Sequence, residues 1–263
     1  MDLSKYNIPL SQLPLSAQKI LNQRTMNQEF LDYHLSPEIV NSDLKDGIYK
    51  NQECSYFIKC TSDMPGVEPS MIDWWFAWHL PESARYKLWH PKDHVSATIL
   101  QDRSKLKTDK ERYIGISSYV EEYIGNKFSK LCITFKDPEE FGFKFSSRKD
   151  FTAICAEVID LDTGIKISNI LHYVESKENG SLMMSYFWLG RNLQHQNKIL
   201  NLLVRFFSKI KRIKGYFIND ILANNLLKHC LEEMNHLSFF LPMLYKDITR
   251  SSNLEYKKGE IYE

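Results

Sequence analysis

The chain has 263 residues, 43% of them hydrophobic and 13% aromatic, which is enough to build one large domain or one domain with a small appendage. Its formal net charge of +1 argues against a nucleic-acid-binding surface, so we expect no nucleic-acid partner. The five cysteines are scattered and form no CxxC pair, which is typical of a reduced cytoplasmic protein. Because we find neither a secretory signal nor an apolar stretch of membrane-spanning length, we expect a cytoplasmic protein without a membrane partner.

The N-terminal part of the sequence predicts more helix than strand. Residues 1–50 look helical and loose, and within them residues 16–23 have a helix-like pattern. Residues 53–61 predict a strand, and residues 70–79 predict a helix rich in tryptophan. We therefore expect a small, mainly helical part before the strand-rich middle of the chain.

The middle of the chain predicts several strands. Residues 130–135 and 141–145 are two candidates, separated by an Asp137-Pro138 turn. Three longer strands follow, and the turns Asp162-Thr-Gly164 and Glu178-Asn-Gly180 are typical of hairpins. These three strands span residues 151–160, 165–175 and 181–189. Because no helix lies between them, they are predicted to pair antiparallel.

Beyond Gly190 the hydrophobic pattern changes to the period of a helix. Residues 197–213 predict one helix, which Gly215 interrupts, and a second helix or a continuation runs from Phe217 to about Phe240. On a helical wheel, one stripe about 100° wide carries apolar residues together with a histidine and a glutamate. The members of this stripe are Ile218, Leu222, Leu226, His229, Glu233 and Leu237.

His229 and Glu233 are the first candidates for metal ligands. Residues four apart on a helix point the same way, so both side chains can reach one cation. A buried His–Glu hydrogen bond or a solvated ion pair is the alternative, because this spacing is common. The apolar stripe favours a cation, since an unpaired carboxylate would be costly there. His236, one turn further along, is a possible substitute ligand.

Further donors lie far upstream of this helix. His90 and His94 bracket Pro91 directly after an aromatic run, which favours a pocket wall over an open surface. Glu121 and Glu122 lie between apolar residues, so one of them should point inward, and the residues alone leave open which one. If His94 and one glutamate converge on the helical pair, the result is a nitrogen-and-oxygen metal site without a thiolate.

His172 is a candidate for a role beside such a site. It lies in a predicted strand and shares one strand face with Ile170 and Val174. A lone histidine on an apolar strand face is often a satisfied core residue. Next to a metal-activated water it could instead orient a substrate hydroxyl or carry a proton.

Two sequence blocks stand out: residues 64–79 read MPGVEPSMIDWWFAWH, and residues 85–94 read RYKLWHPKDH. Both blocks resemble the 2,4-diacetylphloroglucinol hydrolase family. Shorter blocks of similarity follow as VEEYIG at 120–125, FWLG at 187–190, HCLEEM at 229–234 and Leu-Pro at 241–242. The similarity covers roughly residues 40–246, and the block from the tryptophans to HPKDH is its most specific part.

The resemblance implies a zinc-dependent hydrolase with a defined set of site residues. By motif matching, the Zn²⁺ ligands are His94, Glu122, His229 and Glu233. Tyr86 matches a pocket tyrosine and His172 a pocket histidine, and either one could protonate the ring of a substrate.

The resemblance also implies an α+β fold of the Bet v 1-like (helix-grip) type. In this fold a curved antiparallel sheet wraps around a long C-terminal helix, in agreement with the predicted order of strands and helices. Residues 1–80 would then form a mainly helical part that pairs two subunits into a homodimer. Residues 81–263 would form the catalytic domain.

The implied activity is hydrolysis of the carbon–carbon bond between an acyl group and a phenolic ring. The family example converts 2,4-diacetylphloroglucinol to monoacetylphloroglucinol and acetate. The chain departs from the family pattern before FWLG, where Met183-Met184-Ser185-Tyr186 replaces polar or basic residues. Two alternatives are a metalloenzyme with other chemistry on an aromatic polyketide, such as a cyclase or esterase, and a non-catalytic carrier of hydrophobic ligands.

Overall fold

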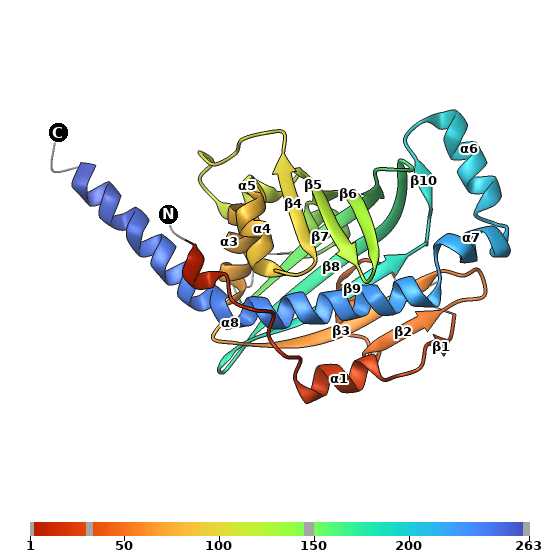
Figure 1. Ribbon diagram of the computed structural model, residues 1–263, viewed down its shortest axis with the longest axis horizontal. Helices are drawn as coiled ribbons and strands as arrows, with labels where there is room; N and C mark the ends of the chain where they lie inside the picture. The colour runs from red at the N-terminus through yellow and green to blue at the C-terminus, as the bar shows by residue number, and fades with distance from the viewer. Residues whose placement is uncertain (1–2, 30–33, 145–149, 260–263) are drawn as a thin grey trace.

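The computed structural model describes residues 3–29, 34–144 and 150–259, and its strands form one large sheet (Figure 1). The order across the sheet is β1-β2-β3-β9-β8-β7-β6-β5-β4, with β10 paired to β8. All described pairs are antiparallel except β1 with β2. The strands are β1 (Met26–Asn27), β2 (Gly47–Lys50), β3 (Tyr56–Pro65), β4 (His94–Ile99), β5 (Ser117–Ile124), β6 (Lys127–Lys136), β7 (Phe151–Asp160), β8 (Ile165–Lys177), β9 (Gly180–Leu189) and β10 (Gln194–His195).

Tight turns with glycine join the three central strands. Gly164 has a φ of 68° between β7 and β8, and Gly180 has a φ of 138° at the start of β9. Residues with a β-carbon rarely adopt such angles, so glycine makes these two turns possible. The predicted hairpins are confirmed: β7 pairs with β8 and β8 with β9, both antiparallel.

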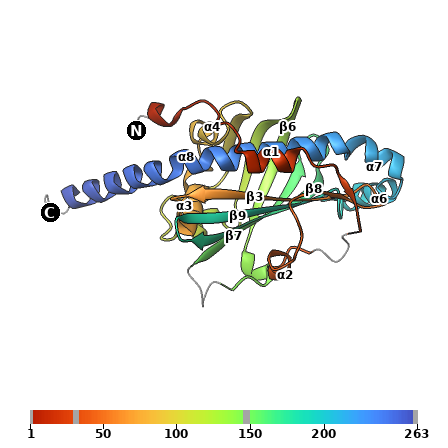
Figure 2. The ribbon, with the colours of Figure 1, turned by 90° about the horizontal axis from the view of Figure 1, so that it is seen from below.

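Most of the helices lie at the ends of the sheet or along the face that α8 covers, and α2 packs on the opposite face. Figures 1 and 2 show α8 running across the sheet, with α3 and α4 at one end and α6 and α7 at the other. The α-helices are α1 (Leu15–Leu21), α2 (Pro37–Val40), α3 (Pro69–His79), α4 (Ser83–Trp89), α5 (Asp109–Tyr113), α6 (Lys198–Phe207), α7 (Lys211–Phe217) and α8 (Asp220–Gly259). Two 3₁₀ helices are η1 (Ser4–Tyr6) and η2 (Pro138–Phe141). The expected α+β architecture, a curved antiparallel sheet around a long C-terminal helix, is therefore confirmed.

Each face of the sheet carries its own hydrophobic cluster. The larger cluster packs α8, through residues such as Leu227, Leu231 and Met234, against α3 and the inner face of the sheet. The smaller cluster lies on the other face and includes Phe57 and Trp188. Alternate side chains along a strand point to opposite faces, so one set of strands supports both clusters. The large cluster encloses the candidate site described below.

Two predicted elements differ in the structure. A strand was expected at 141–145, but η2 occupies its first residue, and residue 145 lies outside the described residues. The Asp137 side chain accepts a hydrogen bond of 3.0 Å from the Glu139 N–H, which caps a helical turn instead. Gly142, with a φ of 89°, then ends this turn.

The single helix expected at 197–213 is instead two helices. Helix α6 ends at Phe207 and α7 begins at Lys211. Ile210 between them has extended backbone angles, which no continuous helix allows. The resulting change of direction lets Lys214 of α7 reach Ser55 at the start of β3.

The sheet continues across residue 80, where a domain boundary was expected. Strands β2 and β3 belong to the same sheet as β4 to β9. The division into a helical part at 1–80 and a catalytic part at 81–263, with pairing of subunits through the first, stays a prediction. Among the described residues, no helix combines the length and the apolar character needed to cross a membrane.

The turn at Gly180 provides a test of how the hairpins are fixed. A β-carbon at Gly180 would lie 2.3 Å from the Met64 carbonyl oxygen and 2.6 Å from the Gly66 nitrogen. We expect Gly180→Ala to lower the free energy of unfolding by at least about 2 kcal/mol, because backbone strain adds to the clash. Urea denaturation would measure the change.

Gly215 in α7 is the matched control. There the nearest atom to an added β-carbon is Cys54 Sγ, at an ordinary 3.7 Å. Gly215→Ala should leave stability unchanged or raise it by up to about 1 kcal/mol, because alanine favours helix over glycine. Equal effects of the two substitutions would contradict the role given to Gly180.

Candidate metal centre

Three elements bring the predicted ligands together. His94 is the first residue of β4, and the register of the sheet places it directly opposite Glu122 on β5. His229 and Glu233 come from the face of α8 that packs against the sheet. All four side chains are buried, with 3–7% of each residue exposed. The four side chains therefore come together between the sheet and α8, and their role as metal ligands stays a prediction.

The four donor atoms lie within a few ångströms of one another. His94 Nε2 and His229 Nε2 are 3.2 Å apart, and His94 Nε2 lies 3.6 Å from both Glu122 Oε2 and Glu233 Oε2. The distances from His229 Nε2 to these carboxylate oxygens are 3.9 and 3.8 Å. Four ligands placed tetrahedrally about 2.0–2.1 Å from a zinc ion would be separated by about 3.3 Å. His94, Glu122 and His229 thus form a buried group that could hold a divalent cation, and Glu233 lies near both histidines of this group.

The hydrogen bonding of His94 leaves the correct nitrogen free for a metal. Its Nδ1 lies 3.0 Å from the Tyr86 carbonyl oxygen, and because a carbonyl can only accept, Nδ1 must carry the proton. The neutral ring therefore presents the lone pair of Nε2 to the other donors. The Tyr86 ring stacks on the imidazole with 3.8 Å between ring centroids, which fixes the ring plane.

Asp93 supports His229 in a similar way. Asp93 Oδ2 lies 3.5 Å from His229 Nδ1, and the Asp93 N–H donates to His90 Nδ1 over 3.0 Å. His90, Asp93 and His229 thus form a second buried group of donor atoms, which shares His229 with the first. A carboxylate behind a ligating histidine orients the ring and raises its basicity. Sequence reasoning missed Asp93, although its place beside His94 in the HPKDH block was a usable signal.

The two adjacent glutamates have different surroundings. Glu122 is buried and accepts a short hydrogen bond from the Tyr86 hydroxyl. Glu121 points to the other face of β5, where its carboxylate accepts from Ser96 Oγ over 2.9 Å. The alternative that the residues left open is therefore resolved geometrically in favour of Glu122.

Burial dominates the electrostatics of the cluster. It raises the pKa of Glu233 well above its usual value, although nearby His229 opposes this. Burial, with the neighbouring His229, also holds the pKa of His94 well below its usual value. For His229 burial acts to lower the pKa, but Asp93, Glu233 and Glu122 outweigh it and raise the pKa to about 9. A divalent cation would stabilise both carboxylates in their charged form and relieve their repulsion.

A cavity of about 80 Å³ adjoins the donor cluster, between the sheet and α8. Its walls are mostly apolar, and Glu122, His229 and Glu233 form its polar end. The aromatic and aliphatic lining includes Phe76, Trp89, Val120, Phe135, Ile154, Phe187 and Leu226. An apolar chamber with a few convergent polar groups is typical of a small-molecule site.

Three further polar groups belong to residues that line this cavity. His172 is buried, and its Nδ1 lies 2.8 Å from Ser185 Oγ. Ser118 Oγ and Trp89 Nε1 are buried without a hydrogen-bond partner among the described residues. Buried polar groups without partners are costly, so their presence here points to a ligand that satisfies them. Sequence reasoning missed Ser118, because only the register of β5 shows that its side chain faces inward.

Other residues singled out from the sequence lie outside the cluster. His236 is buried one turn along α8, but its Nδ1 accepts a hydrogen bond of 3.2 Å from the Ser11 N–H. It is therefore not part of the donor cluster. Met183 and Met184 do not line the described cavity, whereas Ser185 after them reaches His172.

The family comparison agrees with this geometry. Residues 29–246 match the family model of the DAPG hydrolase PhiG domain. The chain belongs to the DAPG hydrolase family. This match contains all four donors of the cluster, together with Tyr86 and His172.

Relatives with curated names are also hydrolases. Phloretin hydrolase of Eubacterium ramulus is 28% identical over 196 residues, which cover 71% of this chain and 66% of that protein. The 2,4-diacetylphloroglucinol hydrolase of Pseudomonas protegens is 26% identical over 93% of this chain and 83% of its own length. The chain thus spans just under two thirds of phloretin hydrolase and most of the second relative.

Solved structures give more distant similarities. The crystal structure of Ara h 8.0201 aligns with a TM-score of 0.34 at 11% identity, over 62% of this chain and 97% of that chain. Ms6760 from Mycobacterium smegmatis aligns with a TM-score of 0.39 at 10% identity, over 77% and 98% of the two chains.

The buried state of His172 predicts a specific dependence of stability on pH. Burial lowers the pKa of His172 to about 3, below the value of about 6.5 in an unfolded chain. As pH falls below 6.5, the unfolded chain takes up a proton that the folded chain does not, so stability is lost. Between pH 7 and pH 5 this loss amounts to about 2 kcal/mol.

We expect His172→Gln to remove this contribution. Its free energy of unfolding should fall by about 2 kcal/mol less than that of the wild type between pH 7 and pH 5. Urea denaturation at a series of pH values would measure the difference. Parallel curves for the two proteins would show that His172 titrates normally in the fold.

Proposed function

We propose that the protein is a zinc-dependent hydrolase that cleaves the bond between an acyl carbon and a phenolic ring. The observation that carries this proposal is the set of four donors from β4, β5 and α8 at one end of an apolar cavity, in which the two imidazoles lie 3.2 Å from each other and 3.6–3.9 Å from the two carboxylates. A carrier of hydrophobic ligands has no use for two buried carboxylates beside two imidazoles, because their burial is costly. Membership of the DAPG hydrolase family supports the same reading.

His94, Glu122, His229 and Glu233 would hold the metal. When bound, zinc supplies a Lewis acid for the acyl carbonyl and lowers the pKa of a water molecule toward about 7. Tyr86 and Asp93 would hold two of these ligands in place, through Glu122 and His229 respectively. The aromatic walls around them keep bulk water out of the cavity.

The cavity suits a flat ring that carries hydroxyl groups. Phe76, Phe135 and Phe187 provide apolar walls for the ring. Ser118 Oγ and Trp89 Nε1 lack partners and can hydrogen-bond to ring hydroxyls. His172 is held neutral by its low pKa of about 3, so it can donate or accept a hydrogen bond without carrying a charge.

Cleavage requires a proton for the ring. Water adds its oxygen to the acyl carbon, the acyl–ring bond breaks, and the electron pair of that bond stays on the ring carbon, which must then be protonated. Of the two protons of the water, one replaces the proton given to the ring and the other is released with the carboxylate product. Burial and the adjacent Glu122 raise the pKa of Tyr86 well above its usual value, so Tyr86 keeps its proton until a strong base forms beside it. We therefore propose Tyr86 as the proton donor and His172 as a group that positions the ring.

The substrate class that we propose is an acylphloroglucinol such as 2,4-diacetylphloroglucinol. The named relatives act on 2,4-diacetylphloroglucinol and on phloretin, which supports this class. The products would be the deacylated ring, here monoacetylphloroglucinol, and acetate.

The adjacent glutamates of β5 test the metal site. We expect one zinc ion per chain in the wild type, measured by mass spectrometry of the purified protein. Glu122→Gln should weaken the affinity for zinc by at least about 100-fold, since loss of a residue that only supports a ligand already lowers metal affinity by about 10–100-fold. Glu121→Gln is the matched control and should keep wild-type affinity, because Glu121 faces Ser96. Wild-type zinc binding by Glu122→Gln would refute the assigned ligand set.

Tyr86 tests the proposed reaction. Wild-type protein should release acetate and monoacetylphloroglucinol in equal amounts, and Tyr86→Phe should lower kcat by about 10²–10⁴-fold. Tyr123→Phe is the control, because Tyr123 is 40% exposed on β5 and lies outside the cavity. If zinc is bound but no acylphloroglucinol is cleaved, the substrate class is wrong while the metal site stands.

A further inference from the structure

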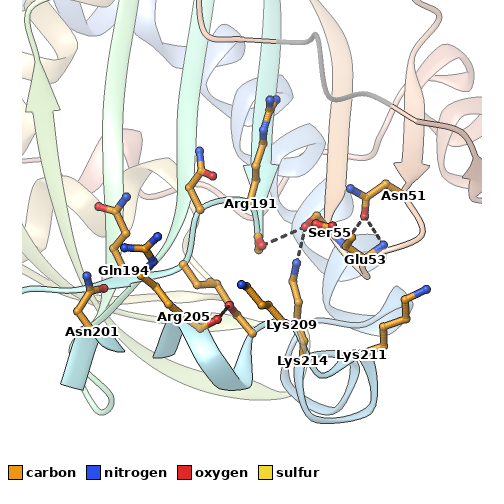
Figure 3. A pocket seen from close by; sticks show the side chains of 14 residues that line it. Asn51, Glu53, Ser55, Arg191, Gln194, Asn201, Arg205, Lys209, Lys211 and Lys214 are labelled. Atoms are coloured by element: carbon orange, nitrogen blue, oxygen red, sulfur yellow. Dashed lines mark hydrogen bonds between the residues drawn. The ribbon is translucent and has the colours of Figure 1, made fainter. Parts of the chain in front are cut away.

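A second, larger pocket lies at the other end of the molecule from α3 and α4. It has a volume of about 830 Å³ and is formed by α6, α7, the turn between β2 and β3, and the segment after β9 (Figure 3). Its lining contains five cationic side chains and one carboxylate, Glu53. The cations are Arg191, Arg205, Lys209, Lys211 and Lys214, which leaves a net charge of +4. None of the chemistry proposed above uses this pocket.

The sequence around the pocket is strongly basic. Residues 191–219 contain seven lysines and arginines and no aspartate or glutamate, although the whole chain carries only +1. Cations gathered around one hollow repel each other, and this repulsion destabilises the fold. A multiply charged anion in the pocket would convert the repulsion into attraction.

Lys214 is the most buried of these cations. Only 6% of the residue is exposed, and its ammonium donates a hydrogen bond of 2.5 Å to Ser55 Oγ, a neutral group. Among the described residues, no carboxylate lies within ion-pair distance of it. Burial lowers the pKa of Lys214, and Glu53 opposes that shift. A buried ammonium with one neutral acceptor still has donors to offer a ligand.

The local backbone is shaped to bring Lys214 into this position. Ser55 Oγ donates over 3.1 Å to the Gly190 carbonyl oxygen, which links β3 to the end of β9. Gly190 has a φ of 72°, and a β-carbon there would lie 2.8 Å from Ile218 and 3.4 Å from Lys214 Cε. A glycine is therefore needed for the close approach of α7 to the sheet.

Helix α6 turns its polar side toward the pocket. Asn201 and Arg205 of this helix and Ser208 directly after it line the hollow, and in Figure 3 the Arg205 and Lys209 side chains extend toward its interior. The opposite, apolar side of α6 faces outward, and Ile199, Leu202 and Phe206 are 64–72% exposed. This is the reverse of the usual arrangement for a surface helix. The polar side of α6 therefore serves the pocket.

We propose that this pocket binds a compact anion that carries phosphate groups and at least two negative charges. Arginine matches phosphate oxygens with paired hydrogen bonds, and two arginines and three lysines line the pocket. No aromatic side chain lines the described pocket, so an aromatic ligand would find no stacking partner. The same phosphate chemistry could come from a free anion such as pyrophosphate, or from the headgroup of an anionic lipid beside the exposed apolar side of α6.

Calorimetry with pyrophosphate and the full-length protein tests the free anion. We expect measurable binding to the wild type and a loss of roughly tenfold or more in Arg205→Gln/Lys209→Gln. The matched control is Lys198→Gln/Arg212→Gln, which removes the same charge from the same exposed segment but outside the pocket lining. This control should keep wild-type affinity within about twofold, because screening in salt weakens distant charges. Thermal unfolding would confirm that both variants fold.

Flotation with phosphatidic acid vesicles tests the lipid source. Vesicle binding that the Arg205→Gln/Lys209→Gln variant loses and the control keeps would place the phosphate on a lipid headgroup if pyrophosphate does not bind to the wild type. Lys214→Met should also weaken the binding of pyrophosphate, and Lys214→Arg at the same position should restore that binding in part. The proposal is overturned if the wild type binds neither pyrophosphate nor vesicles, or if both double variants weaken binding equally.

Discussion

The candidate site depends on the burial of two carboxylates and two imidazoles in an apolar cavity. Glu122 and Glu233 are removed from water between the sheet and α8, and His94 and His229 share the space between them. Without a cation, this arrangement keeps the pKa of Glu233 high and raises the pKa of His229, whose Nε2 lies 3.2 Å from His94 Nε2. Tyr86 and Asp93 then hold two of the donors in fixed orientations. The cost of this burial is what makes a resident divalent cation the simplest account of the cluster.

Much of the fold was predictable because local signals agreed with the tertiary structure. The turns at Gly164 and Gly180 determined the central hairpins, and the apolar stripe of α8 placed His229 and Glu233 on its buried face. The strand expected at 141–145 was wrong because the Asp137 side chain caps a helical turn that propensity alone does not reveal. The break between α6 and α7 was missed, because the apolar pattern continues through Ile210, whose extended backbone angles separate the two helices.

The candidate site was predictable in its members but not in its details. Residue types and spacing indicated His94, His229 and Glu233, and the family resemblance added Glu122. Glu122 faces inward because it alternates with the buried residues Val120 and Ile124 along β5, whereas its position opposite His94 follows from the register between β4 and β5, which no local pattern carries. Asp93 was missed although it lies beside His94 in sequence, and Ser118 was missed because its role depends on the cavity that the fold forms around it.

The position of β4 gives the cluster one further consequence. In the described sheet β4 is the terminal strand, so it has a hydrogen-bonded neighbour on one side only. Its register with β5 is also irregular between His94 and Ser96. An ion bound by residues of β4, β5 and α8 would crosslink the edge of the sheet to the helix. Demetallation would then release an open strand edge, the kind of surface from which chains begin to aggregate.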